Sequence, residues 1–161
     1  MIYPIRVATP DDIPEIVRLI RGLADYEHLP AEPNPERLRE HLFGDRPSAE
    51  VLIAEREGRV VGFALFFPNY STFLTQPGIY LEDLFVEPEH RGVGIGKTLL
   101  VRLAAIAVER GCGRLEWAVL NWNEPAIGFY QALGAAALDD WHTRRLTGEA
   151  LARVAALDQP G

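Results

Sequence analysis

Residues 80–110 form the stretch that most constrains how this chain can fold. Branched and aromatic apolar residues dominate 80–86, which predicts a buried strand. Residues 87–90 include Pro88 and end that strand, and three glycines then alternate with other residues over 91–96. Apolar residues recur at helical spacing from Lys97 to Arg110, so we expect a strand, a glycine-rich turn and a helix in that order. The positions expected to be buried in this helix are Leu99, Leu100, Leu103, Ile106 and Ala107.

The glycine-rich turn has the composition of an anion-binding site. Gly92, Gly94 and Gly96 carry no side chains, so the backbone there can turn sharply and approach a ligand closely. The free N–H groups and the dipole of the following helix favour a negative group, and a pyrophosphate suits such a turn. Arg91 and Lys97 would add positive charge on either side. A tight connection that binds no ligand is the alternative interpretation of the same glycines.

Spacing excludes two other nucleotide-binding motifs. A dinucleotide fingerprint needs Gly-x-Gly-x-x-Gly, whereas this turn reads Gly-x-Gly-x-Gly. The run Gly96-Lys97-Thr98 matches the end of a phosphate-binding P-loop, but the first glycine of that motif would have to be Arg91.

Two motifs in this order resemble the GCN5-related N-acetyltransferases, the GNAT family. Arg91-x-x-Gly94-x-Gly96 resembles the acetyl-coenzyme A loop of that family, and residues 122–135 resemble its second signature, in which an Asn opens a helix and a Tyr lies near its end. Within the family, residues 80–86 and 122–125 resemble the diamine and thialysine acetyltransferase branch. The resemblance extends from Ile5 to about Ala155 and implies acetyl-coenzyme A as co-substrate and a homodimer.

The strand, the turn and the second signature together predict the cofactor site. The main chain of 84–86 would lie along the pantetheine arm and offer an N–H to the thioester oxygen. Asn123 suits a helix N-cap, and the resemblance adds a contact with the same arm. The predicted cofactor-binding residues are Leu84, Phe85, Val86, Arg91, Gly92, Val93, Gly94, Ile95, Gly96, Lys97, Asn123, Glu124, Pro125 and Ala126.

Acetyl transfer to an amine requires a base for the amine and an acid for the departing thiolate. An alkyl ammonium has a pKa of about 10.4, so most of it is protonated at neutral pH. A carboxylate that binds the ammonium and accepts its proton would help the amine to react. Glu82 and Asp83 are candidates, although adjacent strand residues face opposite sides and at most one should enter a given cleft. Structural ion pairs or edge carboxylates are the alternative. Tyr130 could instead be core packing, but the resemblance implies that it is the proton donor and that Glu82 contacts the acceptor amine.

The resemblance also predicts an acceptor site rich in carboxylates. The residues assigned to it, or beside it, are Tyr26, Glu27, Glu82, Asp83, Glu116, Trp117 and Ala118. Where the polyamine enzymes carry an acid and a tryptophan, this chain has Thr72-Phe73-Leu74, which favours a shorter or singly charged amine over spermidine or spermine. Acetylation of peptide N-termini or aminoglycosides, and a coenzyme A-binding module without catalysis, remain alternatives.

Composition limits the number of domains, the kinds of partner and the cellular location that we expect for this chain. The 161 residues suit one domain spanning 1–161, and the net charge of -7 argues against a general nucleic-acid binder while suiting cationic substrates. A single cysteine forms no internal disulfide, and neither a secretory signal nor a membrane-spanning run is visible, so we expect a cytoplasmic protein. The four histidines are scattered, so no metal site is predicted.

The order of predicted elements indicates an α/β or α+β fold with a mostly antiparallel sheet. The resemblance adds a parallel pair in the middle of the sheet that splays open for the cofactor. The predicted strands are 5–8, 51–56, 60–67, 80–86 and 114–119, with a last hairpin from 135–138 and 143–146. The predicted helices begin at 9–12, 34, 97, 125 and 147, and residues 68–78 are expected to form a polar loop.

Overall fold

The computed structural model describes residues 3–159, and the chain divides into two compact units, Met1–Ala118 and Val119–Gly161. The first unit contains β1 (Ile5–Val7), the 3-10 helix η1 (Pro10–Asp12), α1 (Ile13–Glu27), α2 (Pro35–Phe43), β2 (Glu50–Arg56), β3 (Arg59–Ser71), β4 (Gln76–Val86), the 3-10 helix η2 (Pro88–His90), α3 (Ile95–Glu109) and β5 (Leu115–Glu116). The second contains α4 (Glu124–Ala132) and α5 (Gly148–Ala155).

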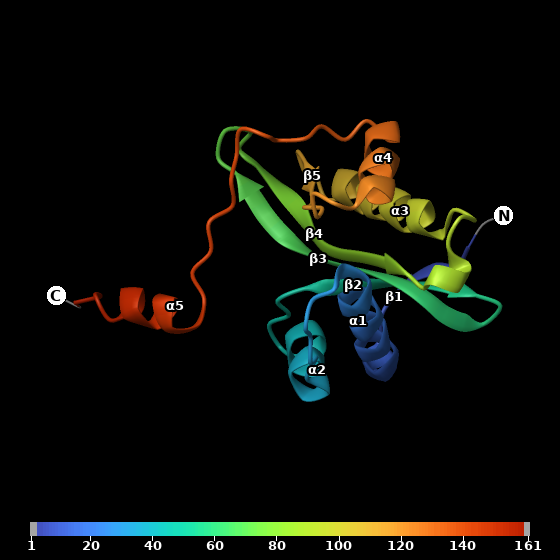
Figure 1. The fold of residues 1–161 in the computed structure, drawn as a ribbon, viewed down its shortest axis with the longest axis horizontal. Coiled ribbons are helices and arrows are strands. Elements are labelled where there is room, and N and C mark those ends of the chain that lie inside the picture. Colours follow the sequence, from blue (N-terminus) through green and yellow to red (C-terminus); the bar gives the residue numbers. More distant parts are fainter. Residues whose placement is uncertain (1–2, 160–161) are drawn as a thin grey trace. The chain divides into compact units, whose positions relative to one another are not determined.

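The sheet of the first unit has the order β1-β2-β3-β4-β5 and confirms the predicted mixed topology (Figure 1). Neighbouring strands are antiparallel except β4 and β5, which run parallel. That parallel pairing covers only Ile79 with Leu115 and Tyr80 with Glu116. Beyond Tyr80, β4 therefore has no strand partner on its outer side among the described residues. The parallel pair that the resemblance predicts is present, but it lies at the edge of the described sheet rather than in the middle, because no strand follows β5 there.

Helices cover both faces of the sheet in this unit. On one face, Ile16 and Val17 of α1 join Leu42 of α2 in a core with Phe63 and Phe85 from the strands. On the opposite face lies α3 (Figure 1). All five positions predicted to be buried in α3 are buried, at no more than 7% exposure. The apolar periodicity of the sequence therefore identified the inward side of this helix correctly.

Local signals placed most element ends where the sequence predicted them. Asn34 accepts a hydrogen bond from the N–H of Arg37 at 3.0 Å through its Oδ1 atom and so caps α2. The turn between β2 and β3 uses left-handed backbone at Glu57 and Gly58, with φ of 54° and 75°. Such paired positive φ values match the right-handed twist of a hairpin.

The predicted loop 68–78 is wrong, because most of it belongs to the hairpin of β3 and β4. Residues 68–71 pair with 76–79, which leaves only 72–75 as the turn. The side chain of Ser71 stabilises this turn by accepting the N–H of Leu74 at 3.2 Å. Pro68 and Pro77 suggested a loop, but hydrogen-bonded and non-hydrogen-bonded pairs alternate along an antiparallel ladder. A proline at a non-bonded pair removes no ladder bond.

The predicted last hairpin is also wrong. Residues 135–138 and 143–146 form no strand within the described part of the second unit. The first of these segments is three alanines and a leucine, and alanine is a poor strand former. The second contains two adjacent arginines and lacks the apolar alternation of a half-buried strand. The predicted strand 114–119 is likewise reduced to Leu115–Glu116.

Candidate active site

The turn between β4 and α3 has the backbone geometry that an anion site requires. Gly92 and Gly94 have φ values of 79° and 98°, a region that residues with a Cβ atom rarely adopt. Gly94 is the N-cap of α3, so the first N–H groups of that helix lack partners within the helix. A Cβ atom built on either glycine would meet nothing within 4 Å. The space above the turn is therefore open, and Lys97 on the first turn of α3 is exposed.

Arg91 does not extend freely into solvent beside this turn. Its Nε atom donates a hydrogen bond to the carbonyl oxygen of Val86 at 2.7 Å. Its guanidinium carbon lies 4.6 Å from the ring centroid of Tyr26 and 5.2 Å from that of Phe85. Both distances are within the range of cation–π contact. The arginine thus holds the start of the turn against the end of β4 and against α1.

The predicted pantetheine strand offers backbone rather than side chains. Phe85 and Val86 are buried, and Leu84 is partly buried. The ring of Phe85 belongs to the core beneath α1. Among the described residues β4 lacks a partner strand here on its outer side, and the carbonyl oxygen of Val86 accepts the bond from Arg91.

A β-bulge interrupts β4 at its two adjacent acids. Asp83 pairs with Leu65, whereas the next residue of β3, Phe66, pairs with Leu81. Glu82 is therefore one extra residue in β4, and the strict alternation of side chains is broken there. The expectation that at most one of Glu82 and Asp83 faces a given side rested on regular alternation, which this strand does not have.

The acids of β4 and the end of α1 influence one another electrostatically. The pKa of Asp83 is raised to about 6, first by burial and then by the negative charges of Glu82 and Glu27. Burial also raises the pKa of the Glu27 carboxyl. We call Glu27, Glu82 and Asp83 the acid cluster. Glu27 is far in the sequence from the adjacent Glu82 and Asp83, and the packing of α1 on β4 brings it near them.

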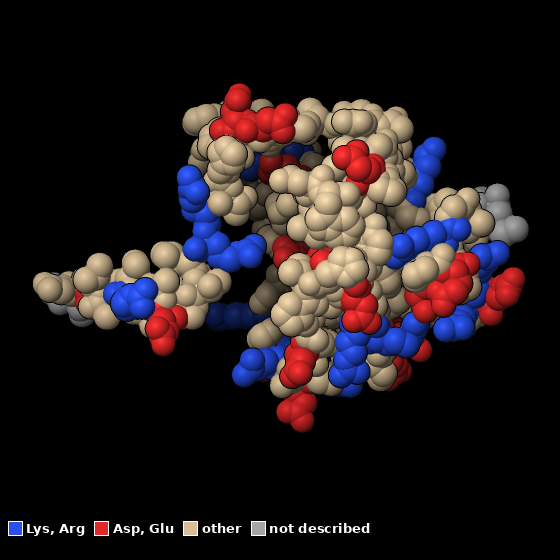
Figure 2. All heavy atoms as spheres, in the orientation of Figure 1, with Lys and Arg blue, Asp and Glu red and all other residues tan. Residues whose placement is uncertain are grey.

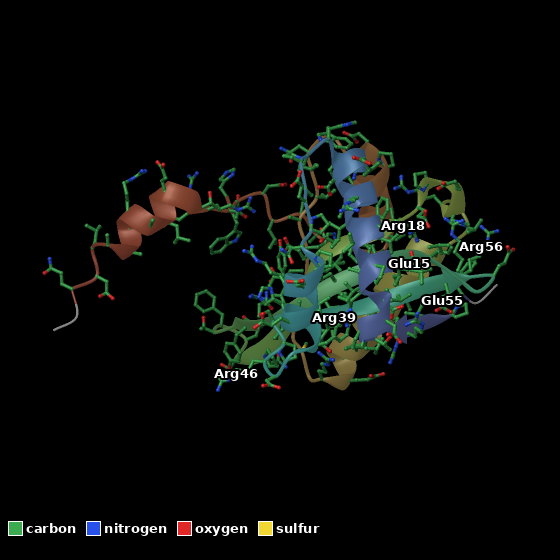
Figure 3. The ribbon with its side chains drawn as sticks, turned by 90° about the horizontal axis from the view of Figure 1, so that it is seen from below. Glu15, Arg18, Arg39, Arg46, Glu55 and Arg56 are labelled. Atoms are coloured by element: carbon green, nitrogen blue, oxygen red, sulfur yellow. The ribbon has the colours of Figure 1, made fainter. Side chains whose placement is uncertain are left out.

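No lysine or arginine neutralises the acid cluster among residues 3–159. Other acids of the unit do have such partners: Asp12 pairs with Arg6 at 2.7 Å, and Glu15 pairs with Arg18 at 2.6 Å. Figure 3 shows Glu15 and Arg18 projecting from the same helix. The described residues supply no ion pair for Glu82 or Asp83, and Glu82 is exposed on a strand that has no outer partner there. A cation from outside the chain would find three uncompensated carboxylates.

Glu116 differs from these acids. Its Oε1 atom lies 2.8 Å from Nε of Arg114 and accepts a hydrogen bond from Nδ2 of Asn69 at 3.3 Å. It does not contribute to the raised pKa of Asp83. Trp117, which follows it, is partly buried, and Ala118 is exposed. The structure therefore brings Glu27 near Glu82 and Asp83 and places Tyr26 against Arg91, whereas Glu116 is engaged in an ion pair of its own.

Five further predicted residues, 123–126 and Tyr130, belong to the second unit. Asn123 caps α4, because its Oδ1 atom accepts the N–H of Ala126 at 3.4 Å. Glu124 and Pro125 are exposed on the first turn of the helix. Tyr130 lies near the end of α4, partly buried, with its ring 5.4 Å from that of Phe129. The predicted capping role of Asn123 is confirmed.

Gly22 is a site residue that sequence reasoning missed. A Cβ atom at this position of α1 would lie only 3.0 Å from the ring of Phe85. The missing side chain lets the Phe85 ring lie against the helix, one turn before Tyr26. A glycine inside a helical pattern was the available signal, because such glycines often mark a close approach.

A cavity of about 720 Å³ lies between α1 and the segment that follows β4. Gly22, Tyr26 and Phe85 contribute to its wall, together with the ion pair of Arg18 and Glu87 at 2.8 Å. Its lining includes none of the acid cluster. Tyr26 and Phe85 therefore both contact the guanidinium of Arg91 and line this cavity.

The part of the chain that the structure describes contains neither a metal-binding group nor a membrane-spanning helix. No group of three or more side chains there is arranged to bind a metal ion. Within residues 3–159 no helix combines the length and apolarity needed to cross a bilayer.

Acidic and basic side chains are interspersed over the face shown in Figure 2, so the net charge of -7 does not form one continuous acidic surface there.

We expect Gly96→Ala to separate ligand approach from folding. A Cβ atom at Gly96 would meet only Cγ2 of Val86, at an ordinary 3.8 Å. Alanine should therefore fit and stabilise α3 by roughly 0.5–1 kcal/mol. If a pyrophosphate lies on this turn, the added methyl group should weaken coenzyme A binding by about tenfold or more, measured by calorimetry. Gly128→Ala in α4, where a Cβ atom would meet nothing within 4 Å, is the matched control. Unchanged affinity in Gly96→Ala would place the ligand elsewhere.

Comparison with known proteins agrees with this geometry. The profile of the acetyltransferase (GNAT) family matches residues 16–135. The chain is 42% identical to a thialysine N-epsilon-acetyltransferase of Bos taurus, over 94% of this chain and 96% of the relative. It is 33% identical to an L-ornithine N5-acetyltransferase of Arabidopsis thaliana, over 98% and 90%. Among solved structures, an integron cassette protein from the mobile metagenome of V. cholerae has a TM-score of 0.81 at 27% identity, covering 96% and 98%.

The match extends over the strand, the turn, α3 and the second signature. Three kinds of observation therefore agree: the motifs, the splayed parallel pair with its glycine-rich turn, and the relatives. The chain belongs to the GNAT family of N-acetyltransferases.

Proposed function

We propose that this enzyme transfers the acetyl group of acetyl-coenzyme A directly to a primary amine of a small cationic substrate, thialysine-like or diamine-like. The acid cluster is the observation that carries the proposal. Three carboxylates without a basic partner favour a cationic acceptor and disfavour an anionic one. The names of the thialysine and ornithine relatives support the same class of amine.

In the proposed reaction the amine nitrogen attacks the thioester carbonyl carbon. A carboxylate of β4 accepts the proton that the ammonium must lose, and the N–C bond forms as the C–S bond breaks. Glu82, which is exposed, is proposed to contact the amine and assist this deprotonation. Asp83 can share that role, because a base with a raised pKa accepts a proton more readily. Tyr130 is proposed to give its proton to the departing thiolate.

Acetyl-coenzyme A supplies the activated acetyl group. The open turn with positive φ at Gly92 and Gly94 suits its pyrophosphate, and Lys97 adds a nearby positive charge. The free edge of β4 at 84–86 suits the pantetheine arm. A main-chain N–H there is proposed to polarise the thioester oxygen.

A substrate panel tests the proposal. We expect thiol release with thialysine or a short diamine to exceed that with spermine, because Phe73, at the position of the acid-and-tryptophan pair of the polyamine enzymes, is 98% exposed at the hairpin turn and offers no charge. Initial rates should rise with pH as more of the amine becomes neutral. Spermine as the best substrate would overturn the specificity argument. Reaction only with peptides or aminoglycosides would overturn the substrate class, and cofactor binding without any turnover would indicate a binding module.

The proposal extends to a homodimer in the cytoplasm. The dimer rests on the family resemblance alone, and light scattering that detects only monomer would refute it. The cytoplasmic assignment rests on the single cysteine of the sequence.

A further inference from the structure

We propose that Arg91 is a positioning residue that couples the cofactor turn to the acceptor side of α1. The inference rests on the proposed function, because it assigns the turn to the cofactor and Tyr26 to the acceptor. It concerns how cofactor binding at the turn changes the affinity of the enzyme for the acceptor amine. All residues that carry it lie within the first unit.

One side chain connects three structural elements here. Arg91 begins the turn, its Nε atom bonds the last carbonyl of β4 at 2.7 Å, and its guanidinium lies 4.6 Å from the ring of Tyr26 in the last turns of α1. Phe85 of β4 lies 5.2 Å from the same guanidinium. The cation thus packs against rings from both α1 and β4.

The packing around this stack restricts where Arg91 can lie. Phe85 is buried and abuts α1 at Gly22, where any Cβ atom would come within 3.0 Å of the ring. Tyr26 lies one helical turn later, on the same side of α1. Both rings are therefore held by the core. Movement of the guanidinium would therefore break its bond to Val86 and its contact with Tyr26 of α1 at the same time.

Cofactor binding would then act on α1 through this arginine. An anion on the turn orders residues 91–96, and a better ordered Arg91 holds Tyr26 more firmly. Glu27 of the acid cluster is the next residue along α1. A binding effect of this kind must be reciprocal, so bound amine should strengthen cofactor binding by the same factor.

The test measures amine affinity with and without coenzyme A, which lacks the acetyl group and cannot react. In the unaltered enzyme we expect thialysine to bind about threefold to tenfold more tightly when coenzyme A is present. This factor corresponds to the free energy of one cation–π contact, here that of Arg91 with Tyr26. Arg91→Lys keeps the charge but loses the planar stack and the fixed Nε bond. In that variant the ratio of the two affinities should fall to about one.

Lys97→Gln is the matched control, because it removes a charge from the same turn without contacting α1. It should weaken coenzyme A binding and leave the ratio unchanged. Tyr26→Leu, made in the full chain, should lower the ratio of the two amine affinities to about one, as Arg91→Lys does. The double variant should give the same ratio as either single variant. At saturating acetyl-coenzyme A, Arg91→Lys should raise KM for the amine by a larger factor than it lowers kcat.

A ratio near one in the unaltered enzyme, or an unchanged ratio in both Arg91→Lys and Tyr26→Leu, would overturn the inference. Failure of the proposed function would look different, because coenzyme A would not bind or no amine would react. If Arg91→Lys lowers the melting temperature so far that it cannot be assayed, Tyr26→Leu alone decides the result.

Discussion

Asp83→Asn should make the fold more stable at neutral pH and the enzyme slower. In the folded chain the pKa of Asp83 is about 6, against 3.8 without the structure. A raised carboxyl pKa means that ionisation opposes folding, so this contribution to stability is greatest at low pH and is lost as the pH rises from about 3.8 through 6. The difference of about 2 pKa units corresponds to a cost of up to about 3 kcal/mol above pH 6.

Thermal unfolding at several pH values measures this effect. Asp83→Asn should raise the melting temperature at pH 8 by several degrees, at about 2–4 °C per kcal/mol, and the gain should shrink toward pH 4. Asp139→Asn, at an exposed position, is the control and should change little. A variant that is less stable than the parent at pH 8 would contradict the unfavourable burial of this charge.

The same variant identifies the base. If Asp83 accepts the proton of the amine, its loss should cost about a hundredfold to ten-thousandfold in rate. We expect kcat/KM of the parent enzyme to fall below pH 6, and Asp83→Asn should remove that fall. Glu82→Gln provides the comparison. A large loss in Glu82→Gln with near-normal activity in Asp83→Asn would assign the base to Glu82 alone. Near-normal activity in both variants would exclude the β4 carboxylates from proton transfer.

Tyr130→Phe should slow the chemical step strongly and leave cofactor affinity nearly unchanged. A phenol that protonates the departing thiolate acts in the transition state, so its removal should lower kcat and kcat/KM together. The expected loss is about a hundredfold to ten-thousandfold. The ring and its contact with Phe129 are retained in this variant, which preserves the packing of α4.

Single-turnover measurement with enzyme in excess keeps product release from hiding the effect. Tyr70→Phe is the matched control, because Tyr70 is 56% exposed on β3 and outside the predicted site. If Tyr130→Phe retains near-normal single-turnover rates, another group or solvent protonates the thiolate. Calorimetry with coenzyme A then shows whether Tyr130 contributes to binding instead.

Short-range signals in the sequence determined the family and the frame of the site. The alternating glycines predicted a turn that the structure builds with positive φ at Gly92 and Gly94. The periodicity of 97–110 predicted the buried side of α3, and Asn123 predicted the cap of α4. These features depend on a few neighbouring residues and on backbone conformations that glycine, asparagine and apolar spacing favour strongly. Such local rules can be read without knowing what packs nearby.

Only the tertiary structure decided which acids act together. The bulge at Glu82 depends on the register between β3 and β4, and a pattern of one strand does not reveal it. Glu27 approaches Asp83 because α1 packs on β4, whereas Glu116 is engaged by Arg114 from the residues beside it. Burial and nearby charge set the pKa of a carboxyl, and both arise from segments that are distant in the chain. The sequence alone therefore identified the acids, and the packing of the strands and helices determined their chemical environment.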